Sequence, residues 1–259
     1  MSLTILLHSS KTMRTNTSTA PLGEPQLLAD ARHLAHLWQQ VPVADLQSHM
    51  KLSPAKAAEV QQLYANWPAT APQTPAIDAF SGDIYSGLQA HTFNASDRAY
   101  AHQHLLILSG LYGGLRACDG VMPYRLEMGY KLPNGGTMYT YWGNRIAALI
   151  PPETSVIINL SAIEYTKAIL PHTTAHVITP KFLTISPKTS EPTFVTVHAK
   201  VARGAFAHWL ITQRVHSPAN LRHFTALNYA YNEALSTPTQ PVFICQQFGG
   251  LGLSVRKAN

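Results

Sequence analysis

The chain has 259 residues, of which 46% are hydrophobic and only 12% are charged. This composition supports a packed core and excludes a disordered or fibrous protein. No apolar run approaches the roughly 20 residues of a membrane-spanning helix, and residues 1–7 lack the basic start and the length of a signal peptide. Cys118 and Cys245 form neither a CxxC motif nor a zinc spacing. We therefore expect a cytoplasmic protein with no membrane contact, no metal and no other cofactor.

Positive charge is concentrated in the C-terminal part of the chain. Lys and Arg total 19 against 13 acidic residues, which gives a net charge of +6 and a pI near 9.3. Residues 1–164 are nearly neutral, whereas residues 165–259 carry nine basic and two acidic residues. Such an asymmetry is typical of a surface that binds a polyanion such as DNA. A solvated basic face without a partner is the alternative.

The predicted elements, in chain order, alternate irregularly between strands and helices. Apolar periodicity predicts a helix over 27–38, Ser53 with Pro54 predicts the start of a second helix that ends near residue 67, and Ser96 is the expected cap of a third. Further helices are predicted at 140–150 and 201–215, and strands at 3–7, 105–108, 156–160, 176–179, 194–197 and 242–245. This order favours a single mixed α/β (α+β) domain over residues 1–259, in which helices surround a mixed sheet.

The segment 108–132 holds five glycines and many of the candidate site residues. Glycines at this density allow a ligand to approach the main chain closely. Leu108–Gly113 resembles the hairpin of a helix-hairpin-helix motif, in which backbone amides, here those of Gly110 and Gly113, contact a DNA phosphate. The usual hairpin has one residue fewer between its glycines.

Charged residues follow this glycine-rich hairpin. Arg116, Asp119, Arg125 and Glu127 could form an anion site, an acid/base pair or a structural network of arginines and carboxylates. Alternation over residues 123–128 predicts a strand that places Arg125 and Glu127 on one face.

Candidate cations and one carboxylate lie on three other segments. Lys11 follows the first strand, in a serine-rich segment that lacks the glycines of a P-loop. Asp83 lies in a glycine-rich turn. Lys200 and Arg203 share one face at the start of a helix, where cations oppose the helix dipole unless an anion binds nearby.

A strand that runs into a capped helix is predicted around residue 161. Ser161 and Glu164 form an S-x-x-E capping box, and Lys167 adds a cation in the first turns of that helix. Mixed sheets often place ligands where a helix begins at the end of a strand. Capping alone also explains Ser161 and Glu164, so both interpretations stay open.

Six blocks spread over nearly the whole chain form a specific combination. They are the strand and SSKT opening (3–12), FSGDIYSGL (80–88), LSGLYGGLRACDGVMPYRLEMGYKL (108–132), YWGNRI (141–146), INLSAIEYTKAI (158–169) and KVARG (200–204). In this order they resemble the YaaA family of bacterial peroxide-stress proteins, although none is a catalytic signature. Two departures stand out: residues 9–12 read SSKT where the family usually has SPAKT, and residues 115–119 read LRACD where it usually has LRPLD.

The resemblance implies a single mixed α/β domain with a basic cleft and a helix-hairpin-helix-like element. It also implies a peroxide-stress protein that binds DNA without strong sequence preference, limits damage to DNA and proteins, and keeps unincorporated iron low. On this hypothesis the cleft contacts DNA phosphates through Lys11, Gly110, Gly113, Arg116, Arg125, Lys167, Lys200 and Arg203.

The alternative hypothesis is an uncharacterised enzyme that acts on a phosphorylated or nucleotide-like small molecule. The sequence contains no GxSxG, no HExxH and no GxGxxG after a strand, so no catalytic motif supports turnover. An enclosed pocket around carboxylates favours this hypothesis, whereas an open basic groove favours DNA. With Arg116 and Arg125 as anion clamps, the acid and base groups come from Asp83, Asp119, Glu127 and Glu164.

Two residue types leave further hypotheses open. The 13 histidines allow a metal or iron buffer, although no carboxylate cluster joins them in the sequence. Cys118 lies in the glycine-rich segment, and we expect a buried structural thiol there rather than a peroxide sensor.

Overall fold

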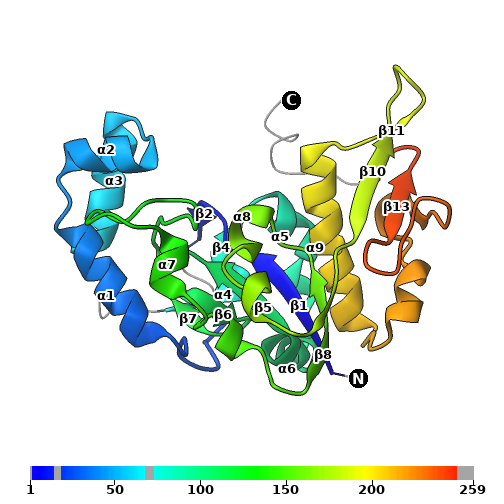
Figure 1. The fold of residues 1–259 in the computed structure, drawn as a ribbon, viewed down its shortest axis with the longest axis horizontal. Helices are drawn as coiled ribbons and strands as arrows, with labels where there is room; N and C mark the ends of the chain where they lie inside the picture. Colours follow the sequence, from blue (N-terminus) through cyan, green and yellow to red (C-terminus); the bar gives the residue numbers. More distant parts are fainter. Residues whose placement is uncertain (1, 15–18, 68–72, 250–259) are drawn as a thin grey trace.

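The computed structural model describes residues 2–14, 19–67 and 73–249. Five strands form the central sheet, namely β1 (Ser2–His8), β5 (Leu105–Ser109), β6 (Gly113–Arg116), β8 (Thr154–Asn159) and β9 (His176–Ile178). Their order is β6-β5-β1-β8-β9, and β6 is an antiparallel edge strand beside β5 (Figure 1). Because the other four strands are parallel, their carboxyl ends meet at one edge of the sheet.

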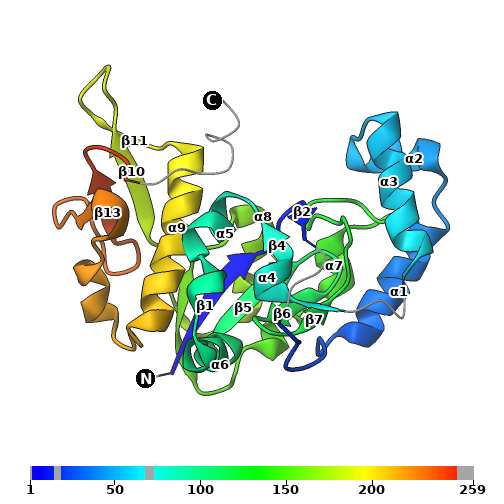
Figure 2. The same cartoon turned by 180° about the vertical axis from the view of Figure 1, so that it is seen from behind.

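The strand β1 lies at the middle of this sheet, and its sequence is mostly apolar. Leu3, Ile5, Leu6 and Leu7 are each at most 1% exposed. A continuous apolar run of this kind is typical of a parallel strand that is covered on both faces. In Figure 2, α4 (Ala76–Ala79), α5 (Asp83–Leu88) and α6 (Ala95–His104) lie on the near face of the sheet.

A second, four-stranded sheet lies beside the long helix α9 (Thr196–Thr212). Its strand order is β11-β10-β13-β12, with one parallel pair, β10 with β13. The bounds are Lys181–Ile185 (β10), Pro192–Thr193 (β11), Tyr229–Tyr231 (β12) and Val242–Cys245 (β13). Two short strand pairs complete the ladders: β2 (Thr12–Met13) with β4 (Phe80–Ser81), and β3 (Thr74–Pro75) with β7 (Gly120–Val121).

The remaining helices flank the central sheet. The first three project to one side, opposite α9 and the second sheet (Figure 1). The α-helices are α1 (Leu28–Gln39), α2 (Val43–Met50), α3 (Pro54–Ala65), α7 (Met138–Trp142) and α8 (Ile163–Thr166). Short 3-10 helices lie at Ala90–Thr92, Ala147–Leu149, Leu170–His172, Pro218–His223 and Ala226–Asn228. The predicted mixed α/β (α+β) fold class is confirmed.

Two of the predicted helix starts can be compared with the observed caps. Ser53 caps α3 by accepting a hydrogen bond from the Lys56 backbone, with Pro54 in the first turn, as predicted. Helix α6 begins earlier than predicted, because Asn94 rather than Ser96 is its cap. Asn94 and Asp97 form a reciprocal capping box there.

Two other sequence predictions are wrong in extent or type. The predicted helix 140–150 is divided into α7 and a 3-10 helix, because Gly143 ends α7 with a φ of 51°. The predicted strand 194–197 is absent, since α9 already begins at Thr196. Phe194 and three β-branched residues favour a strand, but Val195 is the N-cap residue of α9, and Thr196 and Val197 lie in its first turn.

A close helix crossing holds α5 against α9. A Cβ atom added at Gly204 would overlap the carbonyl oxygen of Ile84, and one added at Gly87 would overlap that of Val201. The two backbones therefore touch at a pair of glycines. This crossing fixes the ends of both helices that face the carboxyl edge of the central sheet.

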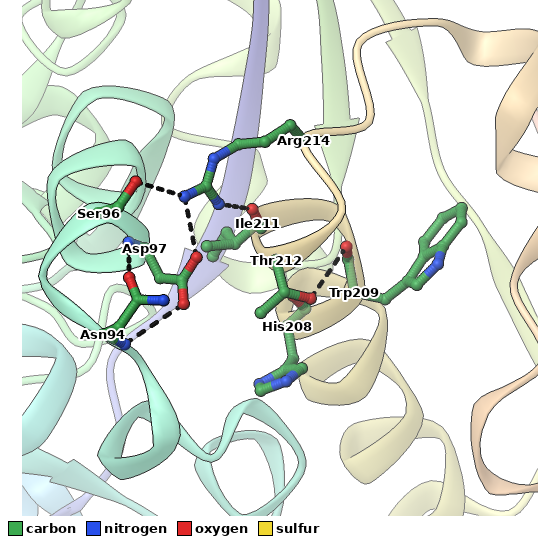
Figure 3. A network of polar contacts seen from close by, with 8 residues as sticks. All are labelled: Asn94, Ser96, Asp97, His208, Trp209, Ile211, Thr212 and Arg214. Atoms are coloured by element: carbon green, nitrogen blue, oxygen red, sulfur yellow. Dashed lines mark hydrogen bonds and ion pairs between the residues drawn. The ribbon is translucent and has the colours of Figure 1, made fainter.

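Arg214 fastens the other end of α9 to α6 (Figure 3). Its guanidinium lies 2.9 Å from Asp97 Oδ1 and donates a hydrogen bond of 3.0 Å to Ser96 Oγ. It also donates to the carbonyl of Ile211. Because Asp97 belongs to the capping box of α6, one arginine joins the start of α6 to the end of α9. Within the described ranges, no helix is long and apolar enough to cross a membrane.

Candidate functional site

A pocket of about 560 Å³ opens at the carboxyl ends of β1 and β8. This volume lies within the range of small-molecule and cofactor sites. The pocket is lined by His8, Ser9, Ser10, Lys11, Thr12, Ser81, Gly82, Asp83, Ile84, Tyr85, Glu127, Ala162, Glu164, Tyr165 and Lys200. We call it the site pocket.

The strand order explains why a pocket forms here. After β1 the chain next joins this sheet on one side, at β5, whereas after β8 it joins on the opposite side, at β9. Connections that leave neighbouring strands in opposite directions cannot cover the crevice between them. This arrangement is the topological switch point at which open α/β sheets bind ligands.

Five separate segments contribute side chains to the site pocket. The end of β1 supplies His8 and leads directly to Lys11, while α9 supplies Lys200. The start of α5 supplies Asp83, directly after Gly82, whose φ of 137° only glycine adopts without strain. Glu127 and two residues of the α8 region, Glu164 and Tyr165, complete the wall.

His8 is held as a neutral side chain at the centre of this wall. Its Nδ1 accepts a hydrogen bond from the Ala162 backbone N–H at 3.1 Å, so the ring proton is carried by Nε2. The ring stacks on Tyr165, with centroids 4.9 Å apart. Burial, and then the nearby positive charges of Arg203 and Lys200, lower the pKa of His8 to about 3. The imidazole is therefore an uncharged hydrogen-bond donor at neutral pH.

Lys11 and Glu127 form the ion pair of the site pocket. Lys11 Nζ lies 2.9 Å from Glu127 Oε2, and the lysine side chain is 58% exposed. The other carboxylate oxygen, Oε1, accepts a hydrogen bond of 2.5 Å from the Tyr130 hydroxyl. Since Lys11 lies at the surface, an anion that enters from solvent can compete with Glu127 for its charge.

The predicted capping box at residue 161 is wrong, although both of its residues reach the site. Ala162 rather than Ser161 is the cap residue of α8, and no side chain caps that helix. Ser161 Oγ instead lies 3.3 Å from His8 Nδ1. Glu164 Oε1 accepts a hydrogen bond of 2.8 Å from the Gly129 backbone N–H, which fixes the carboxylate in the pocket wall. Contacts with distant segments replace the local cap.

Lys200 and Arg203 lie on the same face of α9, as the spacing predicts. Lys200 lines the site pocket, and the charges of both residues act on the ring of His8. Burial lowers the pKa of Arg203, which remains a cation at neutral pH. These two residues bring positive charge from the basic C-terminal part of the chain to the carboxyl end of β1.

The glycine-rich hairpin is not a helix-hairpin-helix element. Residues 108–113 turn between β5 and β6, two antiparallel strands of the central sheet. Gly110 and Gly113 are buried, as are the residues between them, so their amides face the core rather than solvent. An added Cβ at Gly110 would overlap the carbonyl of Leu126, which shows that close packing of the main chain requires this glycine.

Arg116 and Asp119 lie away from the site pocket and hold loops together. Arg116 donates to the carbonyl of Leu149 at 2.7 Å and to that of Gln103 at 3.3 Å. Asp119 Oδ2 accepts a hydrogen bond of 2.8 Å from the Arg116 backbone N–H. Burial raises the pKa of Asp119 to about 6, although this hydrogen bond opposes the rise. Both residues are thus part of a structural network.

Arg125 and Lys167 also lie outside the residues that line the site pocket. The alternation that predicts a strand over 123–128 is correct in burial, because Tyr124, Leu126 and Met128 are buried and the residues between them are half-buried. These residues nevertheless form no ladder in the structure. Lys167 is exposed just after α8.

The site pocket carries charges of both signs, which corrects the expectation of a basic cleft. Its wall holds Lys11 and Lys200 together with three carboxylates, those of Asp83, Glu127 and Glu164. Two cations of the basic C-terminal part, Arg256 and Lys257, lie outside the described residues.

Sequence reasoning missed three aromatic residues of the site pocket, namely His8, Tyr85 and Tyr165. Tyr85 donates a hydrogen bond of 2.9 Å to the His8 carbonyl. A histidine as the last residue of a buried apolar strand is the signal that could have identified His8, since parallel strands present their ends to ligands. The two tyrosines lack a comparable signal, because each also satisfies a helical core pattern.

Comparison with known proteins gives the family. The family model described as "Peroxide stress protein YaaA" matches residues 3–235. The chain belongs to the peroxide stress protein YaaA family. It is 49% identical to a UPF0246 protein of Salinispora tropica over 98% of both chains. A UPF0246 protein of Tolumonas auensis is 39% identical over 87% of this chain and 90% of its own length.

Two features of this YaaA family member bear on peroxide chemistry. Cys118 is a free thiol, 2% exposed, as expected for a structural cysteine. Burial raises its pKa above the ordinary value, which lowers its reactivity toward peroxide. Among the residues that the structure describes, no three His, Cys, Asp or Glu side chains are grouped as ligands for a metal ion.

Proposed function

We propose that this YaaA family member acts in the peroxide-stress response by binding DNA, largely without sequence preference, at the site pocket. The observation that carries the proposal is the convergence of Lys11 and Lys200, 189 positions apart in the sequence, on one pocket at the switch point of the sheet. Bound DNA is thereby shielded from peroxide- and iron-mediated damage. Phosphate contacts carry no sequence information, which accounts for binding without sequence preference.

The mouth of the site pocket offers cations and a neutral hydrogen-bond donor to a phosphate, beside the three carboxylates of its wall. Lys200 and Arg203 stand beside a neutral imidazole, whose ring proton is available to an acceptor oxygen. In the free protein, Lys11 forms an ion pair with Glu127. Because the Lys11 side chain is exposed, a phosphate can replace Glu127 as its partner. The proposal therefore rests on three cations and one neutral donor.

The test is a salt titration of binding to labelled duplex, single-stranded and branched DNA. The pair K11Q/K200Q is compared with K181Q/K188Q, which removes the same charge from two exposed lysines outside the pocket. For duplex DNA each lost phosphate contact lowers the slope of log K against log salt by about 0.9. We expect the pocket pair to lower the slope by roughly 2 and the control pair to leave it within about 0.5. Equal slopes for both pairs would reject the pocket as the DNA site.

A small-molecule enzyme is the second candidate function, and the carboxylates of the pocket favour it. Asp83, Glu127 and Glu164 line a volume suited to a nucleotide-sized ligand, together with Lys11 and Lys200. On this candidate the lysines bind a phosphoryl group and the carboxylates act as acid and base groups. Asp119, which the sequence also suggested, is not among the residues that line the pocket.

Calorimetric titration with nucleoside mono- and diphosphates tests this candidate. Micromolar binding that K200Q abolishes and K188Q preserves supports it, provided that DNA binding is weak. The candidate is excluded if millimolar nucleotide produces no heat of binding while the protein binds DNA at the same protein concentration.

A further inference from the structure

A second pocket adjoins the site pocket on the side of α2. Its volume is about 490 Å³. It lies between the end of α2 and the turn after Met128 and is lined by Ser48, His49, Lys51, Glu127, Gly129, Tyr130, Lys131 and Glu164. We call it the α2 pocket. Of its lining residues, Glu127 and Glu164 are candidate site residues from the sequence, and Gly129 belongs to the glycine-rich segment 108–132.

The two pockets share a wall, and we call the two together the path. Glu127 and Glu164 line both of them. The path begins at Lys200 on α9, passes the carboxyl ends of β1 and β8, and ends at α2. Figure 1 shows α9 on one side of the central sheet and α1, α2 and α3 on the other, so the lining residues extend from α9 toward α2.

Charges of both signs line this path. Lys11, Lys200 and the carboxylate of Asp83 line the site pocket, Lys51 and Lys131 line the α2 pocket, and Glu127 and Glu164 line the wall that the two pockets share. Within the described ranges neither Lys51 nor Lys131 belongs to a salt bridge. The α2 pocket thus offers two ammonium groups that the fold does not neutralise by direct ion pairing.

The carboxylates of the shared wall are held in place rather than mobile. Glu164 accepts from the Gly129 backbone at 2.8 Å, and Glu127 accepts from the Tyr130 hydroxyl at 2.5 Å. A ligand that spans both pockets must therefore present hydrogen-bond donors at its middle and anions at its two ends. A single nucleic-acid strand has this pattern, because successive phosphates flank a nucleotide whose base carries N–H donors.

From this pattern we propose that the α2 pocket is a second phosphate subsite and that the two pockets together bind an unpaired DNA strand. The inference rests on the proposed DNA-binding function and adds the form of DNA that the site prefers. In a duplex the Watson–Crick N–H groups are already paired, so they are not available to the carboxylates of the shared wall. In an unpaired strand those donors are free to reach Glu127 and Glu164.

Tyr130 supplies a further contact suited to an unpaired base. Its ring is half-buried and lines the α2 pocket beside the carboxylate of Glu127. Aromatic side chains next to a cationic path are the usual stacking platforms of proteins that bind single strands.

The test measures fluorescence anisotropy of a labelled 12-nucleotide single strand and of the matching duplex. The variant is K51N/K131Q, in which asparagine suits the left-handed conformation of residue 51 (φ of 52°), and the control is K181Q/K188Q. We expect K51N/K131Q to weaken single-strand binding about tenfold and to lower its salt slope by roughly 1.4, since each single-strand contact contributes about 0.7. The duplex affinity should change less than about threefold.

Three outcomes separate the two proposals. If K51N/K131Q matches the control while K11Q/K200Q weakens binding, the site pocket binds DNA and the second subsite is rejected. If the unmodified protein binds neither DNA, the proposed function falls, and this inference falls with it. As an independent readout, a nucleoside 3′,5′-bisphosphate should displace the labelled strand at least tenfold better than the 5′-monophosphate, and equal displacement would overturn the inference.

Discussion

Two regions of the molecule use pairs of opposite charge in different ways. On the α6 side, Arg98 holds Asp78 with two parallel hydrogen bonds of 2.8 and 2.9 Å, and both side chains are largely buried, at 16% and 10% exposure. At the site pocket, Lys11 meets Glu127 through a single contact and remains 58% exposed. The first pair fastens α4 to α6, whereas the second leaves its cation accessible to a ligand.

The difference shows that the shape of the cationic group and its burial together separate a structural ion pair from an exposed one. A forked guanidinium matches a carboxylate in two places and loses little by being buried with it. A lysine ammonium is a point charge on a flexible stem, so it can exchange one anion for another. The arginines at 98, 116 and 214 each tie distant segments together, and the cations that line the site pocket are lysines.

The largest effect that we expect comes from the glycine crossing that positions one wall of the site pocket. The substitution Gly204→Ala places a methyl group on the Ile84 carbonyl and should lower the free energy of unfolding by more than about 3 kcal/mol. Gly23→Ala is the matched control, because its new methyl group meets only Asp119 Oδ1, at 3.7 Å. Urea unfolding followed by circular dichroism measures both. Equal stability of the two variants would contradict the crossing described here.

The structural ion pair should be the next most sensitive feature. Arg98→Ala leaves the Asp78 carboxylate buried and unpaired, which should cost about 3 kcal/mol of unfolding free energy. The matched change Lys56→Ala removes the cation of the exposed Lys56–Glu59 pair and should cost less than about 1 kcal/mol. The same unfolding experiment compares them, and a loss of under 1 kcal/mol for Arg98→Ala would contradict a structural role.

The pH dependence of stability should distinguish the two regions by its sign. His8 has a pKa lowered to about 3, so its contribution is fully present above pH 6.5 and is lost as the pH falls toward 3. Asp119 has a pKa raised to about 6 from 3.8, so its contribution is present below pH 3.8 and is lost as the pH rises through 6. Each effect should be on the order of 2 kcal/mol.

The variants His8→Asn and Asp119→Asn isolate these two contributions, because asparagine keeps a hydrogen-bond acceptor and does not titrate. Unfolding free energies are measured at pH 4, 5, 6 and 7. Relative to His8→Asn the unmodified protein should lose stability on acidification, and relative to Asp119→Asn it should lose stability as the pH rises. Parallel curves for a variant and the unmodified protein would show that the corresponding group titrates normally.

The smallest effect on stability should come from breaking the Lys11–Glu127 ion pair of the site pocket. The same change should have a large effect on DNA binding. Lys11→Gln should change the unfolding free energy by less than about 1 kcal/mol. The same variant should lower the salt slope of duplex DNA binding by about 0.9, the value of one phosphate contact. Lys56→Gln serves as the control and should leave the slope unchanged. A stability loss as large as that of Arg98→Ala would remove the distinction between the two regions.

Features that depend on residues within one helical turn could be predicted from the sequence. The way in which distant segments come together at the site could be predicted only in part. Ser53 with Pro54 fixes the start of α3, and the spacing of Lys200 and Arg203 fixes their common face, because both depend on neighbours within one turn. The prediction of a helix-hairpin-helix-like element at 108–113 is wrong because the same glycine pattern occurs in turns between strands and in turns between helices. Only the burial of the surrounding residues decides between the two.

Long-range contacts explain the remaining differences. Ser161 and Glu164 read as a cap from their spacing, but His8 and Gly129 offer them partners that are distant in the sequence. Arg116 likewise donates hydrogen bonds to the carbonyls of Gln103 and Leu149. These partners are also distant in the sequence, so the spacing of neighbouring residues does not predict them.

The most direct test of the central claim is amide hydrogen–deuterium exchange of the protein with and without saturating single-stranded DNA. If the pocket at the ends of β1 and β8 is the binding site, DNA should slow exchange in residues 8–12, 162–167 and 196–204. Protection confined to segments 181–188 and 218–223, whose exposed cations are Lys181, Lys188 and Arg222, with the pocket segments unchanged, would contradict binding at the site pocket.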